Sequence, residues 1–167
     1  MPEVNSIKNK MSIAYMHALN STINYAFNVP QSDFDGLGFD IQVCNKTVGT
    51  SRKIASEANQ INIQLKSVSI NSHTMINITD DGIEYSLADD LIAIGTHYLV
   101  VIVLQSDDEI ENWRTVNEDD LTINARAYYT LIDKIIKKGK VKIPNSNILN
   151  PESYIGLFAA ANNKDAV

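Results

Sequence analysis

The sequence predicts an α+β or mixed α/β domain, and three features of the residue pattern lead to this prediction. A helix is expected near the N-terminus, several strands follow it, and a second helix is expected after residue 150. Residues 61–68 alternate between apolar and polar side chains, as a half-buried strand does. Residues 98–104 form an unbroken apolar run, which is typical of a strand buried on both faces. This order differs from a doubly wound parallel fold, in which strands and helices alternate.

The first elements are one helix and two strands. Residues 12–28 carry apolar side chains at helical spacing, and Pro30 stops the helix because proline disfavours a helical residue before it. Strands are predicted at 39–43 and 61–68, where the pattern has period two. The polar stretches on either side of the first strand predict loops at 31–38 and 46–59.

The middle of the chain predicts further strands. Residues 74–79 and 83–87 favour a hairpin around Asp80, Asp81 and Gly82. A short helix is predicted at 88–96, and a polar turn or short helix at 107–113. Residues 121–131 keep period two and favour a strand, although their Ala and Arg content also suits a helix.

The end of the chain predicts an edge strand and a capped helix. Residues 140–143 form a short strand that ends at Pro144. Asn150 is a good N-cap and Pro151 a good first helical residue, so a helix is predicted from there to about residue 161.

Composition indicates a single domain over residues 1–167. The 167 residues include seven Gly and four Pro, and no long flexible linker stands out. Cys44 is the single cysteine, which excludes an intrachain disulfide and fits a reducing compartment. The polar N-terminus lacks the apolar run of a signal peptide, and 98–104 is far shorter than the roughly 20 residues of a membrane span. We therefore expect a cytoplasmic protein without a membrane partner.

The charge is acidic overall but contains one basic cluster. Fourteen Lys and Arg residues against 20 Asp and Glu give a net charge of −6, which argues against nucleic-acid binding through bulk positive charge. Five lysines gather between residues 134 and 142, and Lys137, Lys138 and Lys140 are the centre of this run. The run predicts a phosphate-binding patch; the alternative is an ordinary solvated face.

One constellation suggests chemistry. Asp40 opens a predicted strand, with Asp33 and Asp35 in the loop before it, and Gln64 and Lys66 share the polar face of a later strand. If the strands pair, a carboxylate, an amide oxygen and a backbone carbonyl meet, and these hard oxygen ligands suit Mg²⁺. A neighbouring lysine suits the hydrolysis of a phosphodiester. The alternatives are ordinary turn chemistry for the Asp residues and a solvated strand face for Gln64 and Lys66.

The same residues resemble the PD-(D/E)XK nuclease superfamily, in which an acid on one strand is followed by (D/E)XK on the next. The chain is similar to an uncharacterised bacterial and phage family placed in that superfamily. The similarity rests on an ordered set of residues: Ala14, Tyr15, Ala18, Asp33, Asp35, Gly38, Asp40, Gln64, Leu65, Lys66, Ser67, 98–104, Trp113, Tyr128, Tyr129, Val141, Ile143 and Pro144.

The resemblance implies a restriction-endonuclease-like mixed sheet flanked by the first and last helices. It implies a Mg²⁺- or Mn²⁺-dependent deoxyribonuclease, with DNA as its partner. Asp40 would hold the metal, Gln64 would complete its coordination, and Lys66 would assist water attack and stabilise charge. Asp35 or Asp33, from the loop, is the candidate for a further metal carboxylate. Because cutting two strands needs two sites, a homo-oligomer or larger complex is expected.

Two departures from the superfamily pattern support an alternative function. Gln64 is neutral where most members have an acid, and residues 11–27 contain no acidic side chain where many members carry a Glu. A site with less negative charge binds Mg²⁺ more weakly. The alternative is a non-catalytic module of the nuclease fold that binds a protein partner or nucleic acid.

Overall fold

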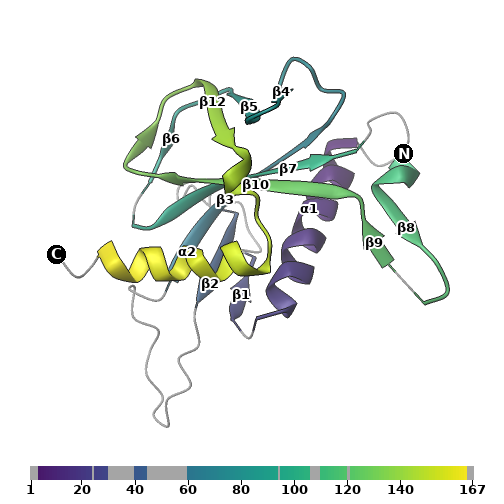
Figure 1. Cartoon of the computed structure of the whole chain (residues 1–167), viewed down its shortest axis with the longest axis horizontal. Helices are drawn as coiled ribbons and strands as arrows, with labels where there is room; N and C mark the ends of the chain where they lie inside the picture. Colours follow the sequence, from purple (N-terminus) through teal and green to yellow (C-terminus); the bar gives the residue numbers. More distant parts are fainter. Residues whose placement is uncertain are drawn as a thin grey trace, which may run out of the picture.

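The computed structural model shows an α+β architecture (Figure 1). It describes residues 4–23, 25–29, 40–44, 60–93, 95–105, 110–119 and 121–164. None of the helices in these ranges is long and apolar enough to cross a bilayer. The loops predicted at 31–38 and 46–59 lie outside the described residues.

A five-stranded mixed sheet forms the centre of the molecule. Its strands, in spatial order, are β1 (Ala26–Asn28), β2 (Ile41–Cys44), β3 (Gln60–Ser69), β7 (His97–Leu104) and β10 (Ala125–Ile132). Neighbouring strands are antiparallel except β3 and β7, which run parallel. The alternation at 61–68 and the apolar run at 98–104 are thus confirmed as strands: β3 is the central strand, and β7 lies beside it.

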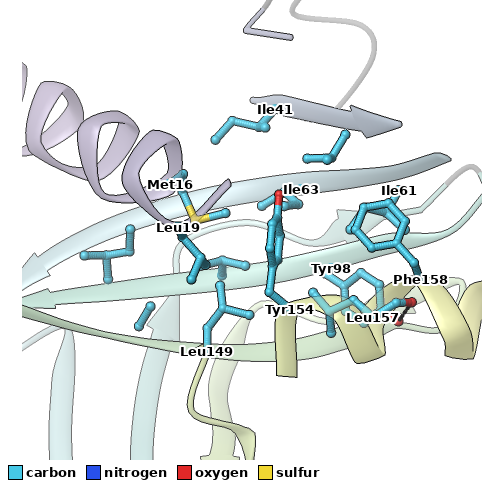
Figure 2. Packing of buried hydrophobic residues seen from close by; sticks show 14 of the residues in the cluster. Met16, Leu19, Ile41, Ile61, Ile63, Tyr98, Leu149, Tyr154, Leu157 and Phe158 are labelled. Carbon is cyan, nitrogen blue, oxygen red and sulfur yellow. Dashed lines mark hydrogen bonds between the residues drawn. The ribbon is translucent and has the colours of Figure 1, made fainter. Parts of the chain in front are cut away.

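Both helices pack on one face of this sheet. Figure 2 shows side chains of α1 (Val4–Ser21) and α2 (Pro151–Lys164) meeting over the strands, among them Met16, Leu19, Tyr154, Leu157 and Phe158. Two buried tyrosines tie the layers together. Tyr154 Oη donates to Asn20 Oδ1 at 3.2 Å, and Tyr98 Oη donates to the Leu157 carbonyl at 3.1 Å. Because the tyrosines satisfy their hydroxyls in this way, their rings are buried without an unpaired polar atom.

A three-stranded sheet covers the opposite face. Its strands lie in the order β12 (Gly139–Pro144), β5 (Gly82–Leu87) and β4 (Ile76–Thr79). The side chains of β7 alternate between the helix side and this second layer, and all eight of its residues are buried. Burial on both faces of this strand is therefore confirmed, as are the hairpin at Asp80–Gly82 and the edge position of β12.

Four short strands and two 3₁₀ helices complete the described residues. They are β6 (Leu91–Ile92) paired with β11 (Ile135–Ile136), β8 (Arg114–Val116) paired with β9 (Leu121–Ile123), η2 (Ile110–Trp113) and η3 (Asn145–Asn147). The period-two stretch at 121–131 is extended, as predicted, and Asn124 divides it into β9 and β10. The Asn124 Nδ2 donates to the Asn112 carbonyl at 2.7 Å, so the residue between β9 and β10 is bonded to η2.

The predicted cap of the last helix is confirmed. Asn150 Oδ1 accepts a hydrogen bond from the Ser153 N–H at 2.9 Å, and the Asn150 N–H donates to Ser153 Oγ at 2.8 Å. These reciprocal bonds satisfy two groups that a helix start leaves unpaired.

The helix predicted at 12–28 begins and ends earlier. Ser21 Oγ and Thr22 Oγ1 donate to the carbonyls of Ala18 and Leu19, both at 2.7 Å. The hydroxyls thereby satisfy carbonyls at the helix end, and the chain turns into β1.

The helix predicted at 88–96 is wrong. Asp90 Oδ1 accepts from the Lys138 N–H at 2.8 Å and its Oδ2 from Lys137 Nζ at 2.9 Å. These bonds hold the chain beside β11, where Leu91 and Ile92 form the short strand β6. Gly95, with φ 77°, then takes a conformation that a helix does not allow.

Candidate active site

Asp40 and Gln64 are brought together by the pairing of β2 with β3. Ile41 pairs with Ile63 in this antiparallel ladder, so the residue before β2 faces the residue after Ile63. The Asp40 N–H extends the ladder by donating to the Ile63 carbonyl at 2.9 Å. Since Gln64 and Lys66 are two residues apart on one strand, both lie on the face that Asp40 joins.

The Asp40 carboxylate is held by two neutral donors. Its Oδ2 accepts from the Leu65 N–H at 2.7 Å and from the side-chain amide of Gln64. Burial raises the pKa of Asp40, and the Leu65 N–H and the charge of Lys66 oppose this rise. The two donors therefore fix the carboxylate in position and partly desolvate it, although the residue as a whole keeps solvent-exposed area.

Asp40 and Lys66 both line a cavity of about 540 Å³. The polar side chains around this cavity include four more residues: Asn5, Lys8, Asn9 and Ser67. The cavity lies at the β2 edge of β3, because β2 begins at Ile41 opposite Ile63 and, among the described residues, no strand pairs along this edge with the later part of β3. The N-terminal half of α1 lies there instead, with Ser67 Oγ 3.4 Å from Asn9 Oδ1.

The oxygen atoms around Asp40 could ligate a divalent cation, although only one of them comes from a charged group. Asp40 supplies a carboxylate, and the Leu65 carbonyl faces the same side of β3 as the Leu65 N–H that binds Asp40. The Gln64 amide carries an oxygen and a nitrogen, and a half-turn about its last torsion exchanges them beside Asp40. These are the oxygen types that Mg²⁺ prefers. No group of three His, Cys, Asp or Glu side chains gathers as metal ligands among the described residues. Asp33 and Asp35 lie outside them.

The lysines predicted to bind phosphate lie elsewhere. Lys140 and Lys142 pair in register with Ser86 and Glu84 of β5, on the face opposite Tyr85, which lines the cavity. Lys140 Nζ and Lys142 Nζ lie 3.5 and 3.4 Å from Glu84. The structure therefore does not bring the lysine run into the Asp40 cavity.

Two carboxylates hold this lysine run. Lys137 Nζ lies 2.9 Å from Asp90, and the side chains of Lys140 and Lys142 share Glu84. The pKa of Asp90 is lowered by the Lys138 N–H and by Lys137, and that of Glu84 by Lys142 and Lys140. Phosphate binding by Lys137, Lys138 and Lys140 stays a prediction.

Sequence reasoning missed the contribution of α1. Asn5, Lys8 and Asn9 precede the helix predicted at 12–28 and belong to the polar N-terminus, yet they line the cavity across from β3. A signal was present: Ile7, Met11 and Tyr15 recur every four residues, and all three pack against the helix-side core.

Comparisons with family models, curated proteins and solved structures found no match to this chain.

Proposed function

We propose that this protein is a metal-dependent deoxyribonuclease that hydrolyses DNA phosphodiester bonds at the Asp40 cavity. The observation that carries the proposal is that Asp40 and Lys66, from two neighbouring strands, line one cavity, and that the Gln64 amide donates to the Asp40 carboxylate there. This is the arrangement that the resemblance to PD-(D/E)XK nucleases implies for these positions.

Each residue has a distinct part in the proposed reaction. Asp40, the Leu65 carbonyl and the Gln64 amide would hold Mg²⁺ or Mn²⁺, which supplies Lewis acidity and lowers the pKa of bound water. Lys66 lies close enough to Asp40 to act on the pKa of its carboxyl. Its ammonium stabilises the negative charge that develops on the phosphate and orients the attacking water. The backbone bond from Leu65 keeps the carboxylate in place without adding charge.

A second function is favoured by one feature of the same site. Asp40 already accepts two hydrogen bonds, and the amide beside it is neutral. A carboxylate satisfied in this way needs no cation. A non-catalytic module that binds a protein partner or nucleic acid through the cavity is therefore the alternative.

Gln64→Glu separates the two functions. The change is nearly isosteric and adds one negative charge beside Asp40, so the affinity for Mn²⁺ should rise by about tenfold or more. Calorimetric titration with Mn²⁺ measures this, beside a plasmid-nicking assay. Asp40→Asn should lose both metal binding and nicking.

Gln60→Glu is the matched control. Gln60 lies on the same face of β3 as Gln64 but four residues away, where it donates to Asn62. It adds the same charge at a distance from Asp40 and should leave Mn²⁺ affinity nearly unchanged. If the wild type nicks nothing and Gln64→Glu binds no Mn²⁺, the nuclease proposal fails and the binding module replaces it.

A further inference from the structure

The cavity beside Asp40 has two chemically different walls. One wall is polar and carries Asp40, Lys66 and Ser67 from the β2–β3 edge, with Asn5, Lys8 and Asn9 of α1. The other wall is mainly apolar and carries Val68, Met75, Tyr85, Leu87, Ala88 and Leu91, with Ser72 and Asp89 as its polar members. Val68 follows Lys66 on the same face of β3, so the two walls meet on one strand.

The apolar wall is a fixed part of the fold. Val68, Tyr85 and Leu87 belong to the second hydrophobic core, and Leu91 packs against it. Met75 extends this wall at the surface, with 41% of its area exposed. Its backbone is held on both sides, because the Met75 N–H donates to the Ser72 carbonyl and its carbonyl accepts from the Ser86 N–H, each at 2.8 Å. The exposed methionine is therefore positioned by the backbone.

The shape and chemistry of these walls suit one nucleotide. A cavity of about 540 Å³ lies in the range of small-ligand pockets, roughly 300–1,000 Å³. A nucleobase offers a flat apolar face, which methionine and aromatic side chains contact well, and its phosphate offers charge. A base that is paired and stacked inside a duplex has no free face, so only an unpaired base can enter a concave site.

We propose that the cavity binds one unpaired nucleotide of a DNA single strand. The base lies against Met75, Tyr85 and Leu91, and the adjoining phosphate lies at Lys66. This inference rests on the proposed function and names its substrate class as single-stranded DNA or an unpaired end. A single-strand cut needs only one site, so the substrate itself does not require a dimer.

Binding is tested without cleavage. Fluorescence anisotropy in the presence of EDTA compares a labelled oligothymidylate of about ten nucleotides with the same strand in a duplex. The single strand should bind at least about tenfold more tightly. Met75→Glu places a charge on the apolar wall and should weaken single-strand binding by about tenfold, whereas Met75→Leu should retain it.

Ile78→Glu is the matched control. Ile78 belongs to β4, is 48% exposed and is not among the residues that line the cavity. It adds the same charge on the same hairpin, and single-strand binding should stay within about twofold of wild type. Thermal melting of each variant shows that it is folded, and both apolar positions are exposed enough to accept Glu.

The outcomes separate this inference from the proposed function. Equal binding of duplex and single strand, or equal effects of Met75→Glu and Ile78→Glu, overturns the nucleotide site, whether or not the protein nicks DNA. Selective single-strand binding that Met75→Glu weakens supports the nucleotide site even where Mn²⁺ produces no cleavage. In that case the nuclease proposal alone fails.

Discussion

The Asp40 cavity differs from the surface that carries the lysine run (Lys134, Lys137, Lys138, Lys140 and Lys142; the lysine face) in how it holds its charged groups. In the cavity, Asp40 is bound by an amide and a backbone N–H, and packing raises its pKa. On the lysine face, Lys137, Lys140 and Lys142 each lie within 4 Å of a carboxylate. Three of the five lysines of this run thus pair with two carboxylates, while the few charged groups at the cavity lie beside a space that a ligand can fill. Local charge density in a sequence is a poor guide to reactivity, because surface ion pairs form easily and contribute little.

The largest expected difference between the two regions is in catalysis. Lys66→Ala removes the ammonium beside Asp40 and should lower the nicking rate by about 10²- to 10³-fold, as loss of one charge-stabilising donor does. Lys140→Ala removes an ammonium that faces Glu84 on the other side of β5 and should leave the rate at saturating DNA within about twofold. Plasmid nicking with Mn²⁺ measures both. Similar losses in the two variants would show that the chemistry does not belong to the cavity.

A smaller difference is expected in the dependence of stability on pH. Since burial raises the pKa of Asp40 above its unfolded value, ionised Asp40 destabilises the fold once the pH exceeds that folded pKa. Asp90 behaves in the opposite way, because the Lys138 N–H lowers its pKa. The stability that Asp90 contributes is present above its unfolded pKa and is lost as the pH falls through the folded one.

Thermal melts of two variants against wild type test these signs. As the pH rises from about 3 to 6, the melting temperature of Asp40→Asn should rise relative to wild type. That of Asp90→Asn should fall relative to wild type over the same range. Difference curves that slope in the same direction would contradict the contrast between the two regions.

The strands at the centre of the fold were predictable because the spacing of their apolar residues along the sequence reports which faces are buried. The alternation in β3 and the apolar run in β7 each have one extended interpretation, and both were confirmed. The pairing that brings Asp40 to Gln64 follows from adjacent strands. The meeting was expected on the condition that these two strands pair, and the β2–β3 ladder meets that condition.

The remaining elements depend on contacts distant in sequence. Leu91 and Ile92 form a short strand next to Asp90, whose carboxylate binds residues nearly fifty positions later, and no local pattern reports this contact. The apolar wall of the cavity depends on the second sheet packing beside β3. Met75 and Leu91 therefore gave no sign of a site in the sequence, although both line it.

The smallest expected effect concerns Lys134, at the start of the lysine run. Lys134 has φ 77°, the left-handed region that a lysine adopts at a cost of about 1 kcal/mol and that glycine adopts freely. Its carbonyl accepts from the Ala93 N–H at 2.8 Å, a bond that glycine keeps. Because glycine also gains freedom in the unfolded chain, Lys134→Gly should raise the free energy of unfolding by only about 0.5 kcal/mol.

Urea unfolding measures this change in stability. A DNA-binding titration at several salt concentrations measures the effect of losing the lysine charge. If the lysine face binds phosphate as predicted, Lys134→Gly should weaken DNA binding and reduce the salt slope by about one phosphate contact. Gly139, already at φ 122° in the same segment, gives a control when it is changed to Ala, which should destabilise the fold. A Lys134→Gly variant that is more stable and binds DNA with an unchanged slope would show that the lysine face is only a solvated surface.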